Sequence, residues 1–372
     1  MRALGIILAG GNSDRMERLS DRRAVPAMPV AGSFRCIDFS LSSMASSQIA
    51  KVAVLTQFNA RSLNEHLSSS KWWDFGRKKG GLYVFTPVIT KENDLWYQGT
   101  ADAIHQNVEF LKDSHEPYVV IASGDTVFKL DFNRVLDFHI AKQADITVVC
   151  TECSNPAERE RFGVLKLNEE GRILEFQEKP KDASSNKIST GIYILRRRLL
   201  IDLIEEAAGK GYTNFVRDVL IRYKDIKRLY GYPLDSYWSN IATVESYYRT
   251  NLDFLKPELR RFFFREEPVI RTRIDDLPPA KYNPGTVMKN SLVSSGSIVN
   301  CLVENSVIAK DVFLGNHSVV KNCVILNHVY VGDNAHLENC IVESGSTIHA
   351  NAIYQGEDRP QIVVEHSSRF GL

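Results

Sequence analysis

A glycine pair follows the first apolar run of the sequence, where a strand would end and a loop would begin. Residues 4–8 are apolar apart from a single glycine. After Ala9 come Gly10 and Gly11, and Arg15 lies a few positions further on. Glycines at the end of a strand allow backbone N–H groups to approach a phosphate closely. Turns alone explain many such pairs. The segment therefore indicates a phosphate site only if other motifs agree with it.

Other motifs do agree when they are taken together. Alone, the triplet EKP at residues 178–180 would be an ordinary charged turn. As a set, the motifs resemble those of ADP-glucose pyrophosphorylases, and the resemblance extends over nearly the whole chain. The motifs are LAGGNSDRM at 8–16, RAVPAMPV at 23–30, FRCIDF at 34–39, WYQGTADA at 96–103, SGD at 123–125, EKP at 178–180 and STGIY at 189–193.

This resemblance implies a reaction in which ATP and glucose 1-phosphate give ADP-glucose and pyrophosphate. The sugar phosphate would attack the α-phosphorus in line, which depends on cations around the phosphates and on rigid positioning. In the family, two aspartates bind Mg²⁺. The ligands expected for this chain are therefore ATP, ADP-glucose and glucose 1-phosphate, with Mg²⁺ as the cofactor if the chain is active.

Many positions of this chain match functional positions of that family. Arg15 and Asp125 match catalytic positions, and Asp125 also matches the first magnesium-binding aspartate. The residues that match nucleotide-binding positions are Leu8, Gly10, Gly11, Gln98, Gly99 and Thr100. Those that match sugar-phosphate-binding positions are Gly163, Glu178, Lys179, Ser189 and Tyr193.

The departures from the family are concentrated where the triphosphate would bind. A family glycine is Ser13, which restricts positive φ, and the following position is Asp14, whose carboxylate would repel a triphosphate. Two family lysines are Val25 and Ser33, neither of which offers a cation. We interpret these positions as degenerate.

The second magnesium-binding aspartate of the family is Asn240 in this chain. Asparagine offers a neutral carbonyl oxygen but no charge, and such magnesium sites depend on only one or two carboxylates. Losing that carboxylate together with a phosphate-binding lysine would lower the rate by a few orders of magnitude. The alternative is a rearranged site that recruits Lys129, Arg22 or Arg23.

We therefore expect a regulatory, catalytically degenerate subunit that is most similar to the GlgD-type subunits of the family. Such a subunit would join a catalytic ADP-glucose pyrophosphorylase subunit in a heterotetramer and activate it in glycogen biosynthesis. The alternative is an active glucose-1-phosphate adenylyltransferase. A third hypothesis is a sugar-phosphate or nucleotide sensor that uses Glu178 and Lys179 without turnover. Arg35 is a further candidate, for an anionic effector.

Strand-like and helical segments alternate around these motifs. This alternation predicts βαβ units, and hence a Rossmann-like α/β nucleotidyltransferase domain over residues 1–255 with a mainly parallel mixed sheet. The expected strands are residues 4–8, 51–55, 118–121 and 146–149, and a helix is expected over 103–111. Ligands of such sheets bind beyond the carboxyl ends of the strands.

Imperfect hexapeptide repeats occupy residues 285–356, after a proline-rich linker at 256–284 and before a tail at 357–372. Small or turn-forming residues alternate with aliphatic ones, without a helical period. Such repeats predict a left-handed parallel β-helix. The repeats that show it best are NCLV at 300, NSVI at 305, NCVI at 322 and NCIV at 339.

Asparagine and cysteine recur side by side in these repeats. We expect the asparagines to stack as a ladder inside the helix and the cysteines to be small buried residues beside them. The pairs are Asn300-Cys301, Asn322-Cys323 and Asn339-Cys340. Hexapeptide helices also occur in acyltransferases, but no substrate pocket is specified here. The histidines of this region are therefore interpreted as surface or ladder residues: His317, His328, His336 and His349.

The composition excludes two classes of partner. The 372 residues include 46 Lys and Arg against 45 Asp and Glu, a formal net charge of +1. Such a balance provides no general attraction to nucleic acid or to an anionic membrane. The apolar N-terminal run breaks at glycines too early for a signal peptide, and no later run is long enough to span a bilayer. We expect a cytoplasmic protein.

Overall fold

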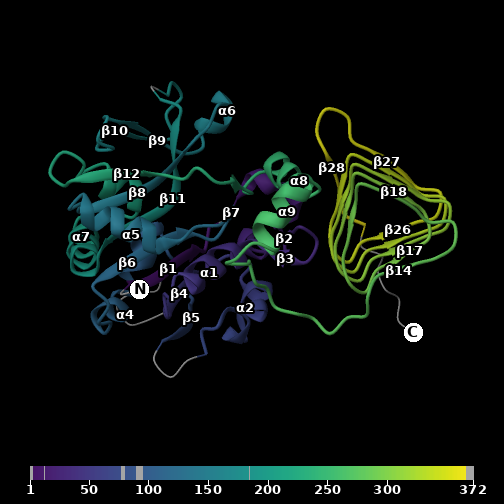
Figure 1. Ribbon diagram of the computed structural model, residues 1–372, viewed down its shortest axis with the longest axis horizontal. Helices are drawn as coiled ribbons and strands as arrows, with labels where there is room; N and C mark the ends of the chain where they lie inside the picture. The colour runs from purple at the N-terminus through teal and green to yellow at the C-terminus, as the bar shows by residue number, and fades with distance from the viewer. Residues whose placement is uncertain (1–2, 12, 77–79, 89–94, 184, 366–372) are drawn as a thin grey trace. The chain divides into compact units, whose positions relative to one another are not determined.

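The computed structural model describes residues 3–11, 13–76, 80–88, 95–183 and 185–365, and the chain forms two compact units (Figure 1). The first unit consists of Met1–Gly11, Phe39–Ala60 and Leu67–Trp238. The second consists of Asn12–Asp38, Arg61–His66 and Ser239–Leu372. The segment that follows the glycine pair thus belongs to the same unit as the C-terminal repeats.

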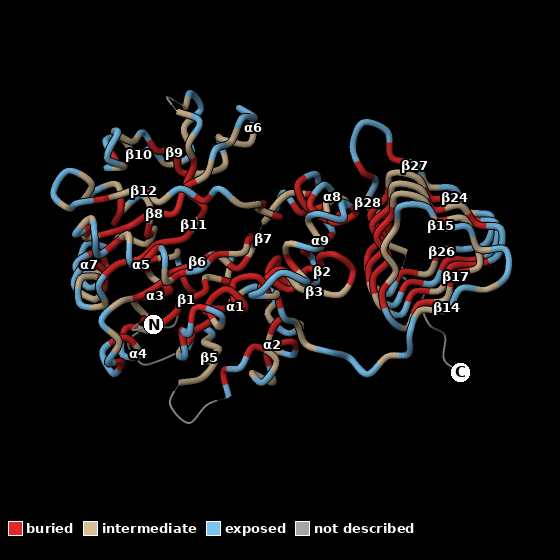
Figure 2. Tube along the Cα trace, viewed as in Figure 1, coloured by how far each residue is buried: buried red, intermediate tan, exposed pale blue. Residues whose placement is uncertain are grey.

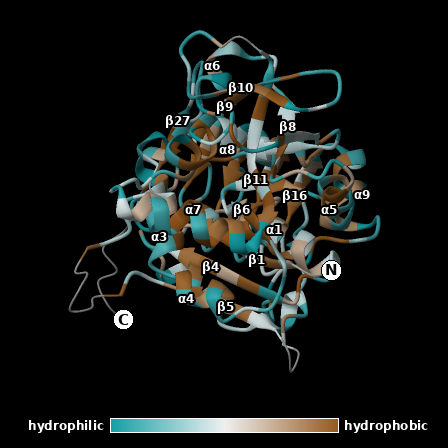
Figure 3. Ribbon diagram, turned by 90° about the vertical axis from the view of Figure 1, so that its left-hand side faces the viewer, coloured by the Kyte–Doolittle hydropathy of each residue, from teal (hydrophilic) through white to brown (hydrophobic). Residues whose placement is uncertain are grey.

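A nine-stranded mixed sheet is the centre of the first unit, and four of its strands run parallel in the order β6-β1-β4-β5. These strands are β6 (Tyr118–Ser123), β1 (Ala3–Ala9), β4 (Lys51–Thr56) and β5 (Gly81–Phe85). Their apolar side chains belong to the core, which Figure 3 shows as brown strands. Nearly continuous apolar runs are typical of parallel strands that are buried on both faces.

The other five strands extend the sheet beyond β6 in mixed directions. They are β11 (Lys187–Arg196), β8 (Ile146–Glu152), β12 (Leu229–Pro233), β9 (Gly163–Leu167) and β10 (Ile173–Glu178). Strand β11 runs antiparallel to β6, β8 and β9, and β8 and β12 run parallel to each other. The mixed nucleotidyltransferase sheet and the four strands expected from the sequence are confirmed.

Helices of the first unit pack against this sheet and against one another. Helix α7 contacts β6 and β11, and α5 contacts β8, β11 and β12. The helix expected over 103–111 is two helices, because Asn107 leaves the helical region at φ −114 and ψ 21. The helices are α3 (Thr100–His105), α4 (Val108–Lys112), α5 (Phe132–Ala141), α6 (Pro156–Arg159), α7 (Arg197–Gly209) and the π-helix η4 (Phe215–Leu220).

Residues 281–363 of the second unit form a parallel β-helix with three sheets, as the repeats predict (Figure 1). Its first sheet is β14 (Lys281–Tyr282), β17 (Ile298–Val299), β20 (Phe313–Leu314), β23 (Tyr330–Val331) and β26 (Thr347–Ile348). The second is β15 (Val287–Lys289), β18 (Leu302–Glu304), β21 (Val319–Lys321), β24 (His336–Glu338) and β27 (Ile353–Gln355). The third is β16 (Leu292–Val293), β19 (Val307–Ile308), β22 (Val324–Ile325), β25 (Cys340–Val342) and β28 (Gln361–Val363).

The expected asparagine ladder is partly wrong. Asn322 and Asn339 occupy successive turns of one corner with φ near +50, a conformation that asparagine tolerates, and they are half-buried rather than inside. Asn300 lies at another corner, where its side chain donates to the carbonyl oxygen of Leu314. The three cysteines are buried as expected, because their small side chains fit the inner corners of the coils.

Several shorter elements complete the second unit. They are η1 (Asp14–Ser20), η2 (Val25–Ala27), β2 (Pro29–Val30), β3 (Phe34–Arg35), α8 (Val244–Asp253) and α9 (Pro257–Phe264). Helix α9 begins with Pro257 at its first turn and buries Phe263, so residues 257–264 of the expected linker are helical. Elements that include residues of both units, or connect within the first, are α1 (Cys36–Ser46), α2 (Arg61–Leu67), η3 (Ser70–Trp73), β7 (Thr126–Phe128) and β13 (Trp238–Asn240).

Figure 2 shows that buried residues follow the strands of the large sheet and recur from coil to coil along the β-helix. Within the described part of the chain, no helix combines the length and the apolar character needed to cross a bilayer.

Candidate functional site

The carboxyl ends of β1 and β6 form one edge of the large sheet. Leu8 of β1 is in register with Ser123 of β6, and its carbonyl oxygen accepts the N–H of Gly124 at 2.9 Å. Asp125 follows directly, and its carboxylate accepts the hydroxyl of Ser123 at 2.5 Å. Gly10 comes immediately after β1. The structure thus brings the candidate residues Leu8, Gly10 and Asp125 to the same edge, where ligands of α/β sheets bind.

The segment from Gln98 to Thr100 begins helix α3. A side chain at Gly99 would lie 2.5 Å from the carbonyl oxygen of Thr213, so the close packing of these segments requires glycine there. The hydroxyl of Thr100 accepts the N–H of Phe215 at 2.9 Å. Gln98 is exposed, and its side-chain amide donates to a backbone carbonyl two residues earlier. Of these three residues, Gln98 presents the polar side chain that could contact a base.

A charged turn lies at the end of the β9–β10 pair. Glu178 is the cross-strand partner of Gly163, and a side chain at Gly163 would lie 3.3 Å from the Glu178 carboxylate. Lys179 follows with φ +48, and its ammonium lies 3.8 Å from the same carboxylate. The Lys179 side chain is 61% exposed. Its charge is therefore available to an anion.

Two hydroxyl groups of β11 lie beside this turn. The hydroxyls of Ser189 and Tyr193 are 3.2 Å apart, and both side chains are buried. Gly191 lies between them with φ +77, at the irregularity that shifts the register of β11 against β8. Burial raises the pKa of Tyr193, and the charge of nearby Glu178 adds to that effect. The structure therefore gathers all five predicted sugar-phosphate residues, since Gly163 and Lys179 adjoin Glu178.

Arg217 is a candidate that the motifs do not reveal. Burial raises the pKa of Glu178, and the positive charges of Lys179 and Arg217 oppose that shift. Arg217 is 65% exposed, and its guanidinium donates to Asp218 at 2.7 and 3.1 Å. It lies in η4, outside every recognised motif, and only the fold brings its charge near Glu178.

Two of the substituted positions meet on one backbone residue of the second unit. The hydroxyl of Ser13 donates to the carbonyl oxygen of Ala242 at 2.6 Å. The side-chain oxygen of Asn240 accepts the N–H of the same Ala242 at 3.1 Å. Both side chains therefore satisfy the protein's own backbone.

The remaining substituted positions also face the protein or carry no cation. Val25, in the place of a family lysine, is only 4% exposed. Ser33 donates its hydroxyl to Ser294 of the β-helix at 3.0 Å. Asp14 and Arg15 begin η1 and are both exposed. Of these four residues, Arg15 is the one that offers a positive charge to a triphosphate.

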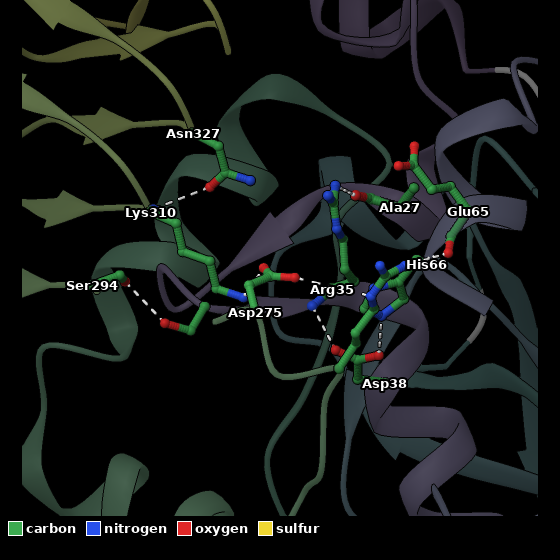
Figure 4. Close-up of polar contacts among 11 residues, drawn as sticks. Ala27, Arg35, Asp38, Glu65, His66, Asp275, Ser294, Lys310 and Asn327 are labelled. Atoms are coloured by element: carbon green, nitrogen blue, oxygen red, sulfur yellow. Dashed lines mark hydrogen bonds and ion pairs between the residues drawn. The ribbon is translucent and has the colours of Figure 1, made fainter. Parts of the chain in front are cut away.

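Arg35 belongs to a polar cluster of the second unit, which Figure 4 shows. Its guanidinium donates to the carbonyl oxygen of Ala27 at 2.5 Å, and its backbone N–H donates to Asp38 at 2.7 Å. The other oxygen of Asp38 lies 2.7 Å from Nε2 of His66. These contacts fix Arg35 at the start of α1.

The charge of Arg35 is partly compensated inside this cluster. Burial lowers the pKa of Arg35 to about 10, the charge of Arg23 adds to that effect, and Asp38 and Asp275 oppose it. Asp275 in turn accepts the ammonium of Lys310 at 2.8 Å. An anionic effector at Arg35 would therefore compete with two carboxylates.

The family implies magnesium, and the described residues supply one charged ligand for it. No group of three or more His, Cys, Asp and Glu residues that could hold a metal occurs among them. Asp125 is half-buried and keeps one carboxylate oxygen beyond its bond to Ser123. Because magnesium sites often consist of one or two carboxylates, waters and substrate phosphates, Asp125 fits such a site.

Two models of protein families match the chain in succession. A model described as nucleotidyl transferase matches residues 4–256, and one described as GlmU-like, C-terminal hexapeptide matches residues 278–361. The first match covers more than half of the chain. The order of the two matches agrees with the strand-rich first unit and the β-helix.

Curated relatives narrow this assignment. Relatives named glucose-1-phosphate adenylyltransferase match most of the chain, as three examples show. The one from Thermosipho africanus (strain TCF52B) is 38% identical over 319 residues, 85% of this chain and 77% of the relative. Those from Geobacillus stearothermophilus and Mycoplasma mobile are 36% and 35% identical over 324 and 320 residues, 86% and 85% of this chain and 83% and 84% of the relatives. This chain belongs to the ADP-glucose pyrophosphorylase family.

Membership of the ADP-glucose pyrophosphorylase family confirms the resemblance found in the motifs. The names of these relatives denote an enzyme, and they favour the alternative of an active adenylyltransferase over that of a regulatory subunit. The sugar-phosphate role of the residues around Glu178 and the metal role of Asp125 stay predictions from the motifs.

Proposed function

We propose that this chain is a glucose-1-phosphate adenylyltransferase whose triphosphate and metal contacts are weakened. The observation that carries this proposal is the exposed ammonium of Lys179 beside the half-buried Glu178. The hydroxyls of Ser189 and Tyr193 lie 3.2 Å apart on β11, and Tyr193 is close enough to Glu178 for that carboxylate's charge to raise its pKa. A cation, an acceptor and two hydroxyls are the groups that a sugar phosphate requires.

Each retained group has a definite role in this proposal. Lys179 binds the phosphate of glucose 1-phosphate, and Glu178 accepts hydrogen bonds from the sugar hydroxyls. Backbone N–H groups after β1 contact the triphosphate. Arg15 is the exposed cation at the start of η1. Asp125 would hold Mg²⁺, which neutralises phosphate charge when it is bound. With both substrates oriented, the sugar phosphate displaces pyrophosphate in line.

The substitutions predict slow turnover. Val25 and Ser33 bring no positive charge, and Asn240 adds no second carboxylate. Electrostatic contacts of this kind are each worth about 10²-fold or more in rate when they act on developing charge. We therefore expect turnover well below that of an enzyme with both lysines and both aspartates.

Release of pyrophosphate from ATP and glucose 1-phosphate in the presence of Mg²⁺ tests this proposal. We expect slow release by the purified chain that requires both substrates, and loss of release in Lys179→Ala. The matched control is Lys181→Ala, which removes a nearby exposed lysine. Absence of release by the wild-type chain at saturating substrates would reject the proposal.

A second candidate function is that of a regulatory subunit in a hetero-oligomer, which would activate a catalytic homologue in glycogen biosynthesis. It is favoured by Ser13 and Asn240, whose side chains are both used on the backbone of Ala242. For this candidate, the chain alone releases no pyrophosphate, co-elutes with a catalytic subunit and raises its rate. Separate elution and an unchanged rate would reject it.

A further inference from the structure

Two outward rows of side chains follow the second sheet of the β-helix. In each strand of this sheet the middle residue points inward, and the first and third point outward. Middle residues such as Val303, Val320 and Leu337 are fully buried in the β-helix core. The first outward row is Val287, Leu302, Val319, His336 and Ile353, and the second is Lys289, Glu304, Lys321, Glu338 and Gln355.

The first of these rows is apolar although it faces outward. Four of its five members are aliphatic, with Leu302 and Val319 half-buried at its centre and Val287 43% exposed at one end. Folding of the coil does not require them, because the inner row already forms the core. Contiguous apolar side chains on a surface are typical of interaction sites.

In the third sheet of the same β-helix, a similar outward row of aliphatic side chains is covered by other parts of the second unit. Its outward aliphatic residues Val307, Val324 and Ile341 are at most 1% exposed. Helix α8 contacts β22 there, and Tyr248 of α8 donates its hydroxyl to the carbonyl oxygen of Asn322. Among the described residues, no helix packs to a comparable extent against the second sheet.

The charges of the second row indicate which partner fits this face. Lys289, Glu304, Lys321 and Glu338 alternate in sign from strand to strand. A second copy can face this sheet when the two copies are related by a two-fold axis that runs parallel to the strands, between β18 and β21. In that arrangement the strands of the second copy follow one another in the reverse order. Lys289 then faces Glu338, and Glu304 faces Lys321, while the central Leu302 faces Val319 of the apolar row.

Other two-fold arrangements of the same face do not fit. An axis along the β-helix would place the charged row of one copy against the apolar row of the other. An axis through β21 would place Lys321 against Lys321 and Glu304 against Glu338. Like charges in such positions are repulsive, and charges against aliphatic side chains lose hydration without a partner.

We propose that the outer face of the β15–β18–β21–β24–β27 sheet is an interface between two copies of this chain, related by a two-fold axis between β18 and β21. Leu302 and Val319 form its apolar centre. The alternating row sets the register, because displacement by one strand brings like charges together. Alternation also stabilises the row within one copy, where neighbouring strands are about 4.8 Å apart.

Particle mass of the full chain in solution tests the apolar centre. We expect Leu302→Glu to halve the mass found for the wild type, since Leu302 points outward and its replacement leaves the core intact. The control is Tyr330→Glu, an exposed residue of the first sheet, which should leave the mass unchanged. A wild type that is already monomeric, or a mass that is halved only by Tyr330→Glu, would overturn the proposal.

Charge reversal tests the register independently of folding. Glu304→Lys alone and Lys321→Glu alone each place like charges at two facing positions, so each should weaken association by about tenfold or more. In a mixture of the two variants, position 304 of either copy again faces a side chain of opposite charge at position 321 of the other. The mixture should therefore regain the wild-type mass. Failure of the mixture to associate more tightly than either variant would overturn the two-fold arrangement.

Discussion

The charged turn around Glu178 and the substituted residues of the second unit use polar chemistry in opposite ways. Lys179 keeps an exposed ammonium 3.8 Å from a carboxylate, and nothing in that pair prevents it from binding a phosphate. Ser13 and Asn240, in contrast, are hydrogen-bonded to the backbone of Ala242. The first region keeps an exposed cation, whereas the polar side chains of the second are used on the backbone.

This difference shows that a matching position is not sufficient for a matching role. Release of a side-chain hydrogen bond costs about 1 kcal/mol, so Asn240 could be redirected to a metal at moderate cost. Val25 cannot be redirected, because it has no polar group and is buried. The side chain at position 240 could therefore still become a metal ligand. At position 25 a polar contact would require a substitution.

The largest effect is expected for Asp125→Ala. This change removes the carboxylate that we propose as the magnesium ligand, and pyrophosphate release should fall at least about 100-fold, or about 2.7 kcal/mol. Asp137→Ala, which changes an exposed aspartate of α5, is the control and should leave the rate unchanged. Equal rates for wild type and Asp125→Ala would show that the residue does not take part in the reaction.

The next effect concerns the stability of the substituted region. Val25→Lys introduces a charge at a position that is 4% exposed, and we expect a loss of about 2 to 3 kcal/mol in the free energy of unfolding. Thermal unfolding measures it. The comparison variant is Ser33→Lys, at a half-buried position, which should cost less. A Val25→Lys protein as stable as the wild type would contradict the conclusion that the side chain at position 25 serves packing.

Asn240→Asp should restore part of the missing charge. The aspartate keeps an oxygen that can accept the N–H of Ala242, so we expect no loss of folding and about a tenfold gain in pyrophosphate release, or about 1.4 kcal/mol. Asn334→Asp, at an exposed turn of the β-helix, is the control. An unchanged or lower rate would mean that position 240 does not limit turnover.

The smallest effect is a pH-dependent change of stability in Glu178→Gln. Burial raises the pKa of Glu178 in the folded state above its unfolded value, so ionisation of this carboxyl opposes folding at neutral pH. Glutamine removes that cost, and the variant should unfold at a slightly higher temperature than the wild type at pH 7. The difference should vanish below about pH 4, where the glutamate is protonated in both states. A difference that is independent of pH would have another origin.

Motifs and periodicity are sufficient to predict much of the architecture. The strand at residues 51–55, the parallel β-helix and the nucleotidyltransferase family follow from local patterns, because alternation and hexapeptide repeats reflect packing along the chain. The break of the expected helix at Asn107 does not, since it depends on a side-chain bond to Ala103 and on Tyr97.

The candidate site is less accessible to sequence reasoning. Arg217 influences Glu178 only because the fold brings its charge near that carboxyl, and no motif contains it. The sequence also shows that Ser13 and Asn240 replace family residues, but their shared contact with Ala242 requires coordinates. Asn300 does not join the predicted ladder, because it lies at another corner of its coil, where its side chain donates to the carbonyl oxygen of Leu314.

Calorimetric titration of the chain with glucose 1-phosphate, without nucleotide or Mg²⁺, tests the contrast between the two regions most directly. Saturable heat for the wild type and for Lys181→Ala is predicted, with affinity lowered about tenfold or more in Lys179→Ala. No heat from the wild type at millimolar ligand would contradict the claim that the turn around Glu178 remains organised for a sugar phosphate.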